Sequence, residues 1–315
     1  MAEVLVLSEA DVASLLDVDE LLPALADAFR ALSAGRASVP PRIAARAETG
    51  LLGAMPVHLP GVGLAAKLVT VFPDNHARGQ PSHQGLIALF DERDGTPLAV
   101  MDGAHVTAVR TGAAAAVAAG VLARHDARVL AILGAGVQGR SHLEALPRVR
   151  DFDEIRVASR TPEHAAVLAA GHAKARPAGS FAEAAAGADV VCCCTDARAP
   201  ILEAAWLAPG THVSAVGGSF GPELDAATVR GGRVFVEWRG AVTSPPPAGA
   251  YELQGLDPDE VTEVGEVLAG TRPGRTSDDE LTVYKSTGHA VEDVAAARLV
   301  YDRARRAGAG TTLAL

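Results

Sequence analysis

The hydrophobic pattern of the first hundred residues predicts helices followed by an antiparallel sheet. Residues 9–35 carry apolar side chains three and four positions apart, which predicts two short amphipathic helices that end at Gly35. Asp94-Gly95 is typical of a tight hairpin turn between apolar runs. Short apolar segments broken by glycine and proline predict strands at 42–47, 51–58, 63–71 and 84–91.

From Thr107 onward the chain alternates between helices and buried strands. A long alanine-rich helix is predicted at 107–127, and a strand–helix alternation follows up to residue 238. Beyond a proline-rich loop, the pattern predicts a helix at 259–270, a strand-like segment at 281–285 and a last helix that packs on the first domain. Such an alternation is typical of a parallel doubly wound sheet. We therefore predict an α/β protein with a Rossmann domain at 113–287 and an α+β domain formed by 1–112 and 288–315.

The composition excludes several classes of protein and agrees with the predicted fold. The 315 residues are 49% hydrophobic and 21% charged, and their formal net charge of −10 argues against nucleic acid as a partner. The N-terminus lacks the pattern of a signal peptide, and the apolar tract after Thr111 is mostly alanine and glycine and too short for a membrane span. We expect a cytoplasmic protein that does not contact a membrane.

Three consecutive cysteines, Cys192 to Cys194, lie within a predicted core strand. Neighbouring residues of a strand point to opposite faces, so these cysteines do not form a disulfide framework. We interpret them as small buried side chains in a reducing compartment. The histidines show no metal-ligand spacing either, so we predict no metal.

The glycine turn ILGAGVQG is the strongest chemical signal, because it follows a predicted strand and opens a helix. One glycine allows the tight turn, the next lets the backbone approach a pyrophosphate, and the third allows close helix packing. The pattern therefore predicts a dinucleotide cofactor. The residues assigned to it here are Gly134, Ala135, Gly136, Val137, Gln138 and Gly139.

The residues after the next strand favour NADP(H) over NAD(H), although NAD(H) remains possible. NAD-selective sites place an acidic residue there for the ribose 2′-hydroxyl, whereas this chain has Ser159, Arg160 and Thr161. An arginine flanked by two hydroxyls suits a 2′-phosphate. Alternatively, Arg160 is merely solvated, and Thr161 begins the next helix before Pro162.

Taken together, several segments resemble the ornithine cyclodeaminase and mu-crystallin family over nearly the full length. The resemblance implies a homodimer, with substrate pocket and dimer interface both formed by the N-terminal domain and the C-terminal helix. Besides the glycine turn, the segments that carry it are VPPRIAA, LAAKLVTVF, PSHQG, LAVMDG, TAVRTGAAAA, ASRT, GTHVSAVG and the terminal VYKSTGHAVEDVAAARLVYD.

The resemblance implies that Arg42, Lys67 and Arg110 hold the α-carboxylate of a small-molecule substrate. An acidic protein must concentrate its cations to bind an anion, and lysine is rare here, occurring only at positions 67, 174 and 285. A buried Lys67 beside two arginines is expected to have a lowered pKa, which suits a catalytic acid–base role. The alternative is a stem packed in the sheet with the ammonium in solvent.

Further cofactor contacts complete the predicted site. In the family, the PSHQG segment lies against the cofactor, so Ser82 and His83 are assigned to cofactor binding and not to catalysis. The remaining predicted cofactor contacts are Thr111, Thr195, Val216 and Lys285.

The loop AVGGSFGPELD distinguishes the branches of the family. Ornithine cyclodeaminases carry an aspartate where this chain has Ser219, whereas the ketimine reductase and mu-crystallin branch shows a serine there and a lysine at position 285. Glu223 and Asp225 are expected to begin a helix. The resemblance thus implies NADPH-dependent reduction of a ketimine carboxylate, such as 1-pyrroline-2-carboxylate or 1-piperideine-2-carboxylate, with Ser219 donating a hydrogen bond to the carboxylate.

Three alternatives stay open at this point. They are an ornithine cyclodeaminase, an alanine dehydrogenase that aminates pyruvate, and a non-catalytic NADPH or small-ligand binding protein of the mu-crystallin type. The presence of Arg42, Lys67 and Arg110 together favours an enzyme.

Overall fold

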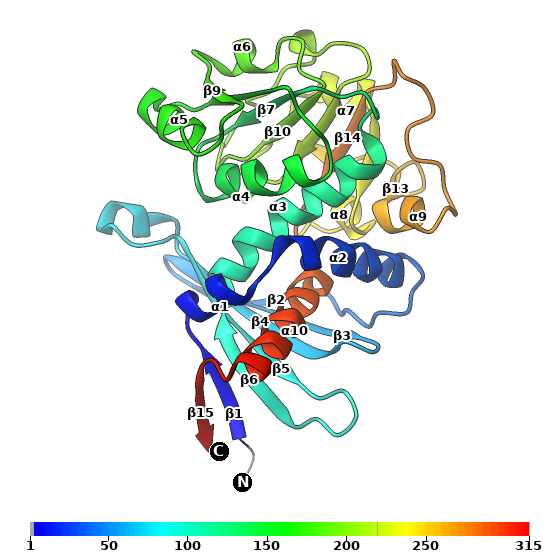
Figure 1. Ribbon diagram of the computed structural model, residues 1–315. Coiled ribbons are helices and arrows are strands. Elements are labelled where there is room, and N and C mark those ends of the chain that lie inside the picture. Colours follow the sequence, from blue (N-terminus) through cyan, green and yellow to red (C-terminus); the bar gives the residue numbers. More distant parts are fainter. Residues whose placement is uncertain (1–2, 219, 315) are drawn as a thin grey trace. The chain divides into compact units, whose positions relative to one another are not determined.

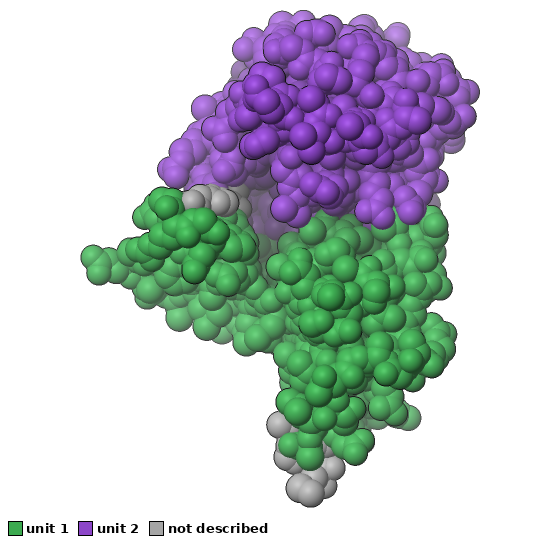
Figure 2. All heavy atoms as spheres, turned by 60° about the vertical axis from the view of Figure 1, so that its left-hand side comes forward, with its two compact units in different colours: residues 1–110, 289–315 green, residues 111–288 purple. Residues whose placement is uncertain are grey.

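The computed structural model describes residues 3–218 and 220–314, which form two compact units. Unit 1 comprises residues 1–110 and 289–315, and unit 2 comprises residues 111–288 (Figure 2). The sequence placed these boundaries after residues 112 and 287. The chain passes from unit 1 into unit 2 within one helix, α3 (Gly103–Leu122).

Unit 1 is a seven-stranded sheet with helices (Figure 1). Its strand order is β15-β1-β6-β5-β4-β3-β2, with β1 parallel to β6 and the other neighbours antiparallel. The strands are β1 (Glu3–Leu7), β2 (Ile43–Ala47), β3 (Gly50–Leu59), β4 (Gly63–Val71), β5 (His83–Phe90), β6 (Pro97–Asp102) and β15 (Thr311–Ala314). The helices are α1 (Glu9–Leu15), α2 (Val18–Ser33), the 3-10 helix η1 (Pro73–Arg78) and α10 (Ala290–Ala307).

Strand alternation decides which side chains of this sheet are buried. On β4, Lys67 lies opposite Met55 of β3 and Ile87 of β5, so these three share one face, and all are buried. Helix α10 packs against β3, β4 and β5. On the other face Leu68 lies opposite Leu86, and both are exposed. The sheet therefore carries Lys67 on its inner face and apolar side chains on its outer face.

Unit 2 is an eight-stranded parallel sheet in the order β13-β12-β14-β11-β10-β7-β8-β9. From β9 to β11 the strands follow the first five positions of the Rossmann order, 3-2-1-4-5, whose reversal falls between β7 and β10. The sixth position is taken by β14, the last strand of the unit in the chain, and not by β12. The strands are β7 (Val129–Leu133), β8 (Glu154–Ala158), β9 (Ala175–Pro177), β10 (Val190–Cys193), β11 (His212–Ala215), β12 (Arg233–Val236), β13 (Thr262–Glu263) and β14 (Thr282–Lys285).

Short helices connect these strands, and two of them begin at residues that the sequence indicated. Thr161 is the N-cap of α5, and Asp225 caps α7 by accepting a hydrogen bond from the Thr228 amide. The helices are α4 (Val137–Ala145), α5 (Pro162–Ala169), α6 (Phe181–Ala185), α7 (Ala226–Gly231), α8 (Gly240–Thr243), α9 (Val264–Leu268) and the 3-10 helices η2 (Leu146–Arg148), η3 (Ala204–Trp206) and η4 (Tyr251–Leu253).

The structure confirms the α/β class and corrects several local predictions. The helix predicted at 259–270 is wrong in extent, because the segment supplies strand β13 and only a short helix, α9. Strands β1 and β15 were not predicted. They pair with each other at one side of the unit 1 sheet, a contact between the two chain ends that a local pattern does not reveal.

Helix α3 also changes the argument about membranes. Among the described residues it is the one helix whose length and composition would allow it to cross a membrane, and 67% of its apolar window is buried. The helix begins at Gly103 and is therefore longer than the apolar tract after Thr111. A buried core helix of a soluble protein passes the same test.

Candidate functional site

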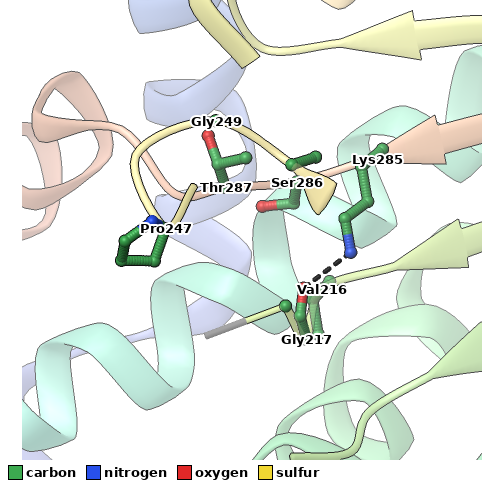
Figure 3. A pocket seen from close by; sticks show the side chains of 9 residues that line it. Val216, Gly217, Pro247, Gly249, Lys285, Ser286 and Thr287 are labelled. Atoms are coloured by element: carbon green, nitrogen blue, oxygen red, sulfur yellow. Dashed lines mark hydrogen bonds between the residues drawn. The ribbon is translucent and has the colours of Figure 1, made fainter. Parts of the chain in front are cut away.

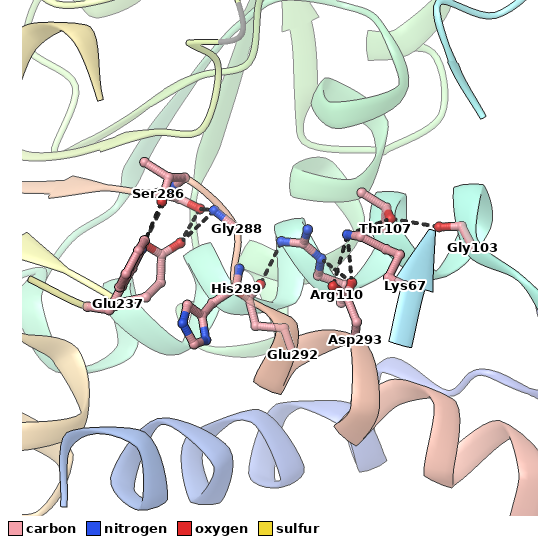
Figure 4. A network of polar contacts seen from close by, with 12 residues as sticks. Lys67, Gly103, Thr107, Arg110, Glu237, Ser286, Gly288, His289, Glu292 and Asp293 are labelled. Carbon is pink, nitrogen blue, oxygen red and sulfur yellow. Dashed lines mark hydrogen bonds and ion pairs between the residues drawn. The ribbon is translucent and has the colours of Figure 1, made fainter. Parts of the chain in front are cut away.

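In unit 1, two of the predicted substrate-binding cations meet at one carboxylate. The Lys67 ammonium lies 3.0 and 2.9 Å from the two carboxylate oxygens of Asp293. Arg110 donates from Nε to Asp293 over 3.2 Å, and from a terminal nitrogen to Glu292 over 2.8 Å. Figure 4 shows Lys67 and Arg110 converging on Asp293. Strand β4, helix α3 and the first turn of α10 thus supply one polar cluster.

Because these side chains are buried, their charges must be paired. The side chains of Lys67 and Asp293 are only 4% and 2% exposed, and an unpaired charge at such a position is strongly unfavourable. Burial lowers the pKa of Lys67, Asp293 opposes that shift, and Arg110 adds to it. Burial acts to raise the pKa of Asp293, yet Lys67 and Arg110 together hold it below its ordinary value. The carboxylate therefore stays charged.

A buried histidine indicates that the third predicted cation lies in the same region. Burial lowers the pKa of His289 to about 3, and the positive charges of Arg42, Arg110 and Lys67 act in the same direction. Asp293 opposes them. At neutral pH the imidazole is uncharged, which suits a hydrogen-bonding role beside the cations. All three predicted cations therefore influence one imidazole.

Sequence reasoning missed the anionic half of this cluster. Glu292 and Asp293 lie in the first turn of α10, where the helix dipole favours negative charge, and Glu292 also accepts a hydrogen bond from the His289 amide. Both acids lie in the HAVED segment, which is among the segments that resemble the family. The resemblance implied no role for them. Apolar surroundings in α10 explain why acids there had to be paired: the helix buries Ala290, Val291, Val294 and Ala295.

The predicted cofactor residues of the PSHQG segment belong to unit 1. Ser82 is buried, and its hydroxyl lies 3.0 Å from Nδ1 of His83, at the start of β5. The structure therefore places these two side chains in direct contact with each other, at the end of a strand that neighbours β4.

In unit 2, the glycine turn has the geometry that a pyrophosphate requires. Gly134 adopts φ +118°, and a Cβ there would lie 2.4 Å from the Cys194 carbonyl oxygen. A Cβ at Gly139 would lie 2.0 Å from the Gly134 carbonyl oxygen, whereas a Cβ at Gly136 would meet nothing within 4 Å. Gly136 is the N-cap of α4 and leaves the helix's first amides without a side-chain cap. The open side of the turn thus fits a bound dinucleotide phosphate.

The residues predicted to choose between NADP and NAD follow β8. Ser159 accepts a hydrogen bond from the Thr161 amide over 3.3 Å. The Arg160 side chain is 81% exposed and lies 3.4 Å from an oxygen of Asp196. Asp196 was not predicted. Its carboxylate lies beside Arg160, the cation that the sequence assigned to the 2′-phosphate of NADP.

Three further predicted cofactor residues lie at the carboxyl ends of adjacent strands. Thr195 follows β10, Val216 follows β11 and Lys285 ends β14. Thr195 donates from both its amide and its hydroxyl to Glu223 over 2.7 Å. Burial raises the pKa of Glu223, against the lowering influence of Lys285 and these donated bonds. Glu223 was expected to begin a helix, but it is instead fully buried below the strand ends.

A small pocket of about 50 Å³ opens at the same strand ends (Figure 3). Val216 and Lys285, both predicted cofactor residues, contribute to its walls. In open α/β sheets, ligands bind outside the carboxyl ends of the strands. Thr111 is buried in α3, and Ser219 lies outside the described residues. The pocket lining is Val216, Gly217, Gly218, Pro247, Gly249, Ala250, Lys285, Ser286 and Thr287.

The three adjacent cysteines are buried thiols. Burial raises the pKa of Cys192 to about 12, so this thiol is protonated at neutral pH. Among residues 3–218 and 220–314, no three His, Cys, Asp or Glu side chains are grouped to hold a metal ion.

Strand order, glycine turn and strand-end pocket define a protein of the dinucleotide-binding class, with a buried cationic cluster in its other unit. The chain belongs to the ornithine cyclodeaminase/mu-crystallin family, whose sequence model matches residues 2–308.

Individual relatives agree with this membership over most of the chain. Mouse ketimine reductase mu-crystallin is 41% identical over 257 residues, which cover 80% of each protein. The structure of Thermococcus litoralis Delta(1)-pyrroline-2-carboxylate reductase, in complex with NADH and L-proline, matches with a TM-score of 0.90, 34% identity and coverage of 98% and 99%. An archaeal alanine dehydrogenase dimer with bound NAD also has a TM-score of 0.90, with 34% identity and 99% coverage of both chains.

The glycine turn gives a matched pair of variants. Gly139→Ala is expected to lower the melting temperature sharply, because its methyl group would collide with backbone. Gly136→Ala is expected to melt within a few degrees of the wild type but to bind NADPH at least about tenfold more weakly, because its methyl group enters the space a pyrophosphate needs. Thermal unfolding and calorimetric titration measure both. Equal NADPH affinity of Gly136→Ala and wild type would contradict the assignment.

Proposed function

We propose that this protein is an NADPH-dependent reductase of ketimine carboxylates, with a cyclic imine such as 1-pyrroline-2-carboxylate or 1-piperideine-2-carboxylate as substrate. The observation that carries the proposal is the convergence of Lys67 and Arg110 on the buried carboxylate of Asp293 in unit 1. Arg42 is added to this cluster because its charge, like theirs, lowers the pKa of His289. The relatives named as ketimine reductase and pyrroline-2-carboxylate reductase support the reaction class.

The charge balance of the cluster suits a substrate with one carboxylate. Three cations, Arg42, Lys67 and Arg110, stand against the two carboxylates of Glu292 and Asp293. The formal charge of this set is therefore +1, which a single substrate carboxylate neutralises. Arginine presents two parallel donors to a carboxylate, so Arg42 and Arg110 can fix its orientation as well as its charge.

Lys67 is the residue we assign to proton delivery. Its lowered pKa allows the ammonium to release a proton more readily than an ordinary lysine. Protonating the imine nitrogen makes the adjacent carbon more electrophilic, and the lysine's fixed position next to Asp293 keeps the donor in place. The neutral His289 ring is proposed to hydrogen-bond the bound substrate without adding charge.

The residues of unit 2 are proposed to hold the cofactor. When bound, NADPH supplies the hydride, which is chemistry that side chains do not provide. The amides at the start of α4 are assigned to the pyrophosphate, and Arg160 to the 2′-phosphate. NADH and NAD occur in the two matching structures, so the preference for NADPH rests on Arg160 and its flanking hydroxyls alone.

Reductive amination of pyruvate is the second candidate, supported by the archaeal alanine dehydrogenase match. The same carboxylate site would serve pyruvate, with ammonia replacing the ring nitrogen. An assay of NADPH and NADH oxidation with 1-pyrroline-2-carboxylate, 1-piperideine-2-carboxylate, and pyruvate plus ammonia separates these activities. Ornithine with NAD, followed by proline and ammonia release, tests the cyclodeaminase alternative. The proposal predicts the highest kcat/KM for a cyclic imine, and no cyclic-imine turnover would refute it.

Two substitutions separate carboxylate binding from proton delivery. Arg42→Ala is expected to raise KM for the imine about tenfold or more with kcat nearly unchanged, because it removes uniform binding. Lys67→Arg keeps the positive charge beside Asp293 but cannot release a proton, so kcat is expected to fall about 100-fold. Lys174→Met, at an exposed surface ion pair with Asp151, is the matched control. Steady-state kinetics on folded variants measure all three, and a wild-type kcat for Lys67→Arg would remove Lys67 from the chemistry.

Cofactor choice gives an independent prediction. Arg160→Gln is expected to weaken NADPH binding about tenfold and leave NADH binding unchanged, because it removes one charge-assisted contact. Asp196→Asn removes the anion 3.4 Å from Arg160, so it is expected to tighten NADPH binding. Dissociation constants for both cofactors test this pair. Parallel losses for NADPH and NADH would show that Arg160 does not read the phosphate.

The outer face of the unit 1 sheet supports a homodimer. Ile43, Leu52, Leu64, Leu68 and Leu86 share this face and are exposed, and such apolar patches mark interfaces. The double variant Leu68→Glu with Leu86→Glu is expected to sediment as a monomer. Val167→Glu, at an exposed apolar position on α5, is the control and should match the wild type. A double variant that sediments like the wild type would place the interface elsewhere.

A further inference from the structure

A buried polar network joins the carboxyl ends of three neighbouring strands in unit 2. Strands β10, β11 and β14 are adjacent in the sheet. Thr195 follows β10, Gly217 follows β11, and Lys285 is the last residue of β14. Each of the three contacts Glu223 or lies within 4 Å of it. The network therefore links the strand ends at which α/β proteins bind ligands.

Glu223 holds two of these strand ends together. One carboxylate oxygen accepts the amide and the hydroxyl of Thr195 over 2.7 Å, and the other accepts the Gly217 amide over 2.6 Å. The side chain is 0% exposed, so these donors replace water completely. Loss of any one of them would leave a buried oxygen poorly satisfied.

Lys285 completes the link from the third strand. Its ammonium donates to the Gly217 carbonyl oxygen over 2.6 Å and lies 3.0 Å from Glu252 and 3.9 Å from Glu223. The Lys285 side chain is 0% exposed. Figure 3 shows its ammonium turned toward Gly217. Lys285, which the sequence assigned to the cofactor, thus has its ammonium directed at two buried carboxylates and one backbone carbonyl.

The loop after β11 fits closely against this network. A Cβ at Gly217 would lie 2.2 Å from the Thr195 carbonyl oxygen and 2.4 Å from the Glu223 carboxyl carbon. Gly218 adopts φ +125°, and a Cβ there would lie 3.3 Å from the Lys285 ammonium. Glycine is therefore required at Gly217 by space and at Gly218 by conformation. The loop conformation depends on where the three strand ends are held.

The same loop forms one wall of the pocket. Val216, Gly217 and Gly218 line it together with Lys285 and the hydroxyl residues that follow. The Lys285 ammonium therefore contacts the backbone that shapes the pocket. A misplacement of about 1 Å can reduce a rate about 100-fold when the reacting groups must be aligned.

We propose that Lys285 is a positioning residue. It holds the Gly217–Gly218 backbone through Gly217 and the two glutamates, and thereby shapes the pocket that receives the nicotinamide ring, without itself binding the cofactor. This inference rests on the proposed function for its substrate, but the pocket and the network are features of unit 2 alone.

The network provides a charge-matched test. Lys285→Met removes the donor and leaves Glu223 and Glu252 buried without their cation, so this single variant is expected to be unstable. Adding Glu252→Gln restores the formal charge of the three side chains to the wild-type value of −1. The double variant is therefore expected to recover most of the lost melting temperature. Glu252→Gln alone, a nearly isosteric change, serves as the second test protein, and Lys174→Met is the control.

The readouts separate positioning from binding. In the double variant, the single-turnover rate of imine reduction is expected to fall at least about tenfold, with the dissociation constant of NADPH changed by less than threefold. The fluorescence lifetime of bound NADPH is expected to shorten, because a loosened pocket immobilises the nicotinamide less. Glu252→Gln alone is expected to show the same changes to a smaller degree.

Two results would overturn the inference. If NADPH affinity falls as much as the rate, Lys285 binds the cofactor directly. If rate, affinity and lifetime all stay at wild-type values in the double variant and in Glu252→Gln, the network is structural only. Should the wild type reduce no imine, the proposed function fails, yet the lifetime and affinity of bound NADPH still decide the role of Lys285.

Discussion

The carboxylate of Asp293 is the interaction on which the substrate site of unit 1 depends. It lies in the first turn of α10, yet it is shared by Lys67 from β4 and Arg110 from α3. None of these charges is stable alone at this depth, because removing one partner leaves another uncompensated. The sheet, α3 and α10 must therefore pack in one register for the cations to be buried at all. The pairing with Asp293 that folding of unit 1 requires is therefore the same arrangement that places Lys67 and Arg110 for the proposed substrate binding.

In unit 2 the site depends on close approach of backbone segments at the glycine turn. Three glycines let β7, the turn and α4 approach so closely that a methyl group at Gly134 or Gly139 would meet backbone oxygen. The strand ends next to this turn are held by Glu223 and Lys285 in addition to apolar packing. The proposed cofactor site is thus held by close backbone contacts at the glycine turn and by a buried polar network at the strand-end pocket.

Periodicity and motif predicted the parts that depend on local sequence. The helices before Gly35, the antiparallel strands and the Rossmann alternation were all visible, because each has its own spacing of apolar residues. The pairing of β1 with β15 was not visible, since it joins the two ends of the chain. Asp293 and Glu223 were missed for the same reason. Their partners lie 226 and 28 residues away, and acids at helix starts or after loops usually face solvent.

The proposed reaction requires the buried cations of unit 1 to recognise a carboxylate next to a C=N bond. The most direct measurement compares NADPH-dependent reduction of 1-pyrroline-2-carboxylate with that of 1-pyrroline, which has the same ring and imine but no carboxylate. If the cluster binds the carboxylate as proposed, kcat/KM should fall by about 1,000-fold or more, because a buried charged site is then left unpaired. Comparable kcat/KM values for the two imines would contradict the account.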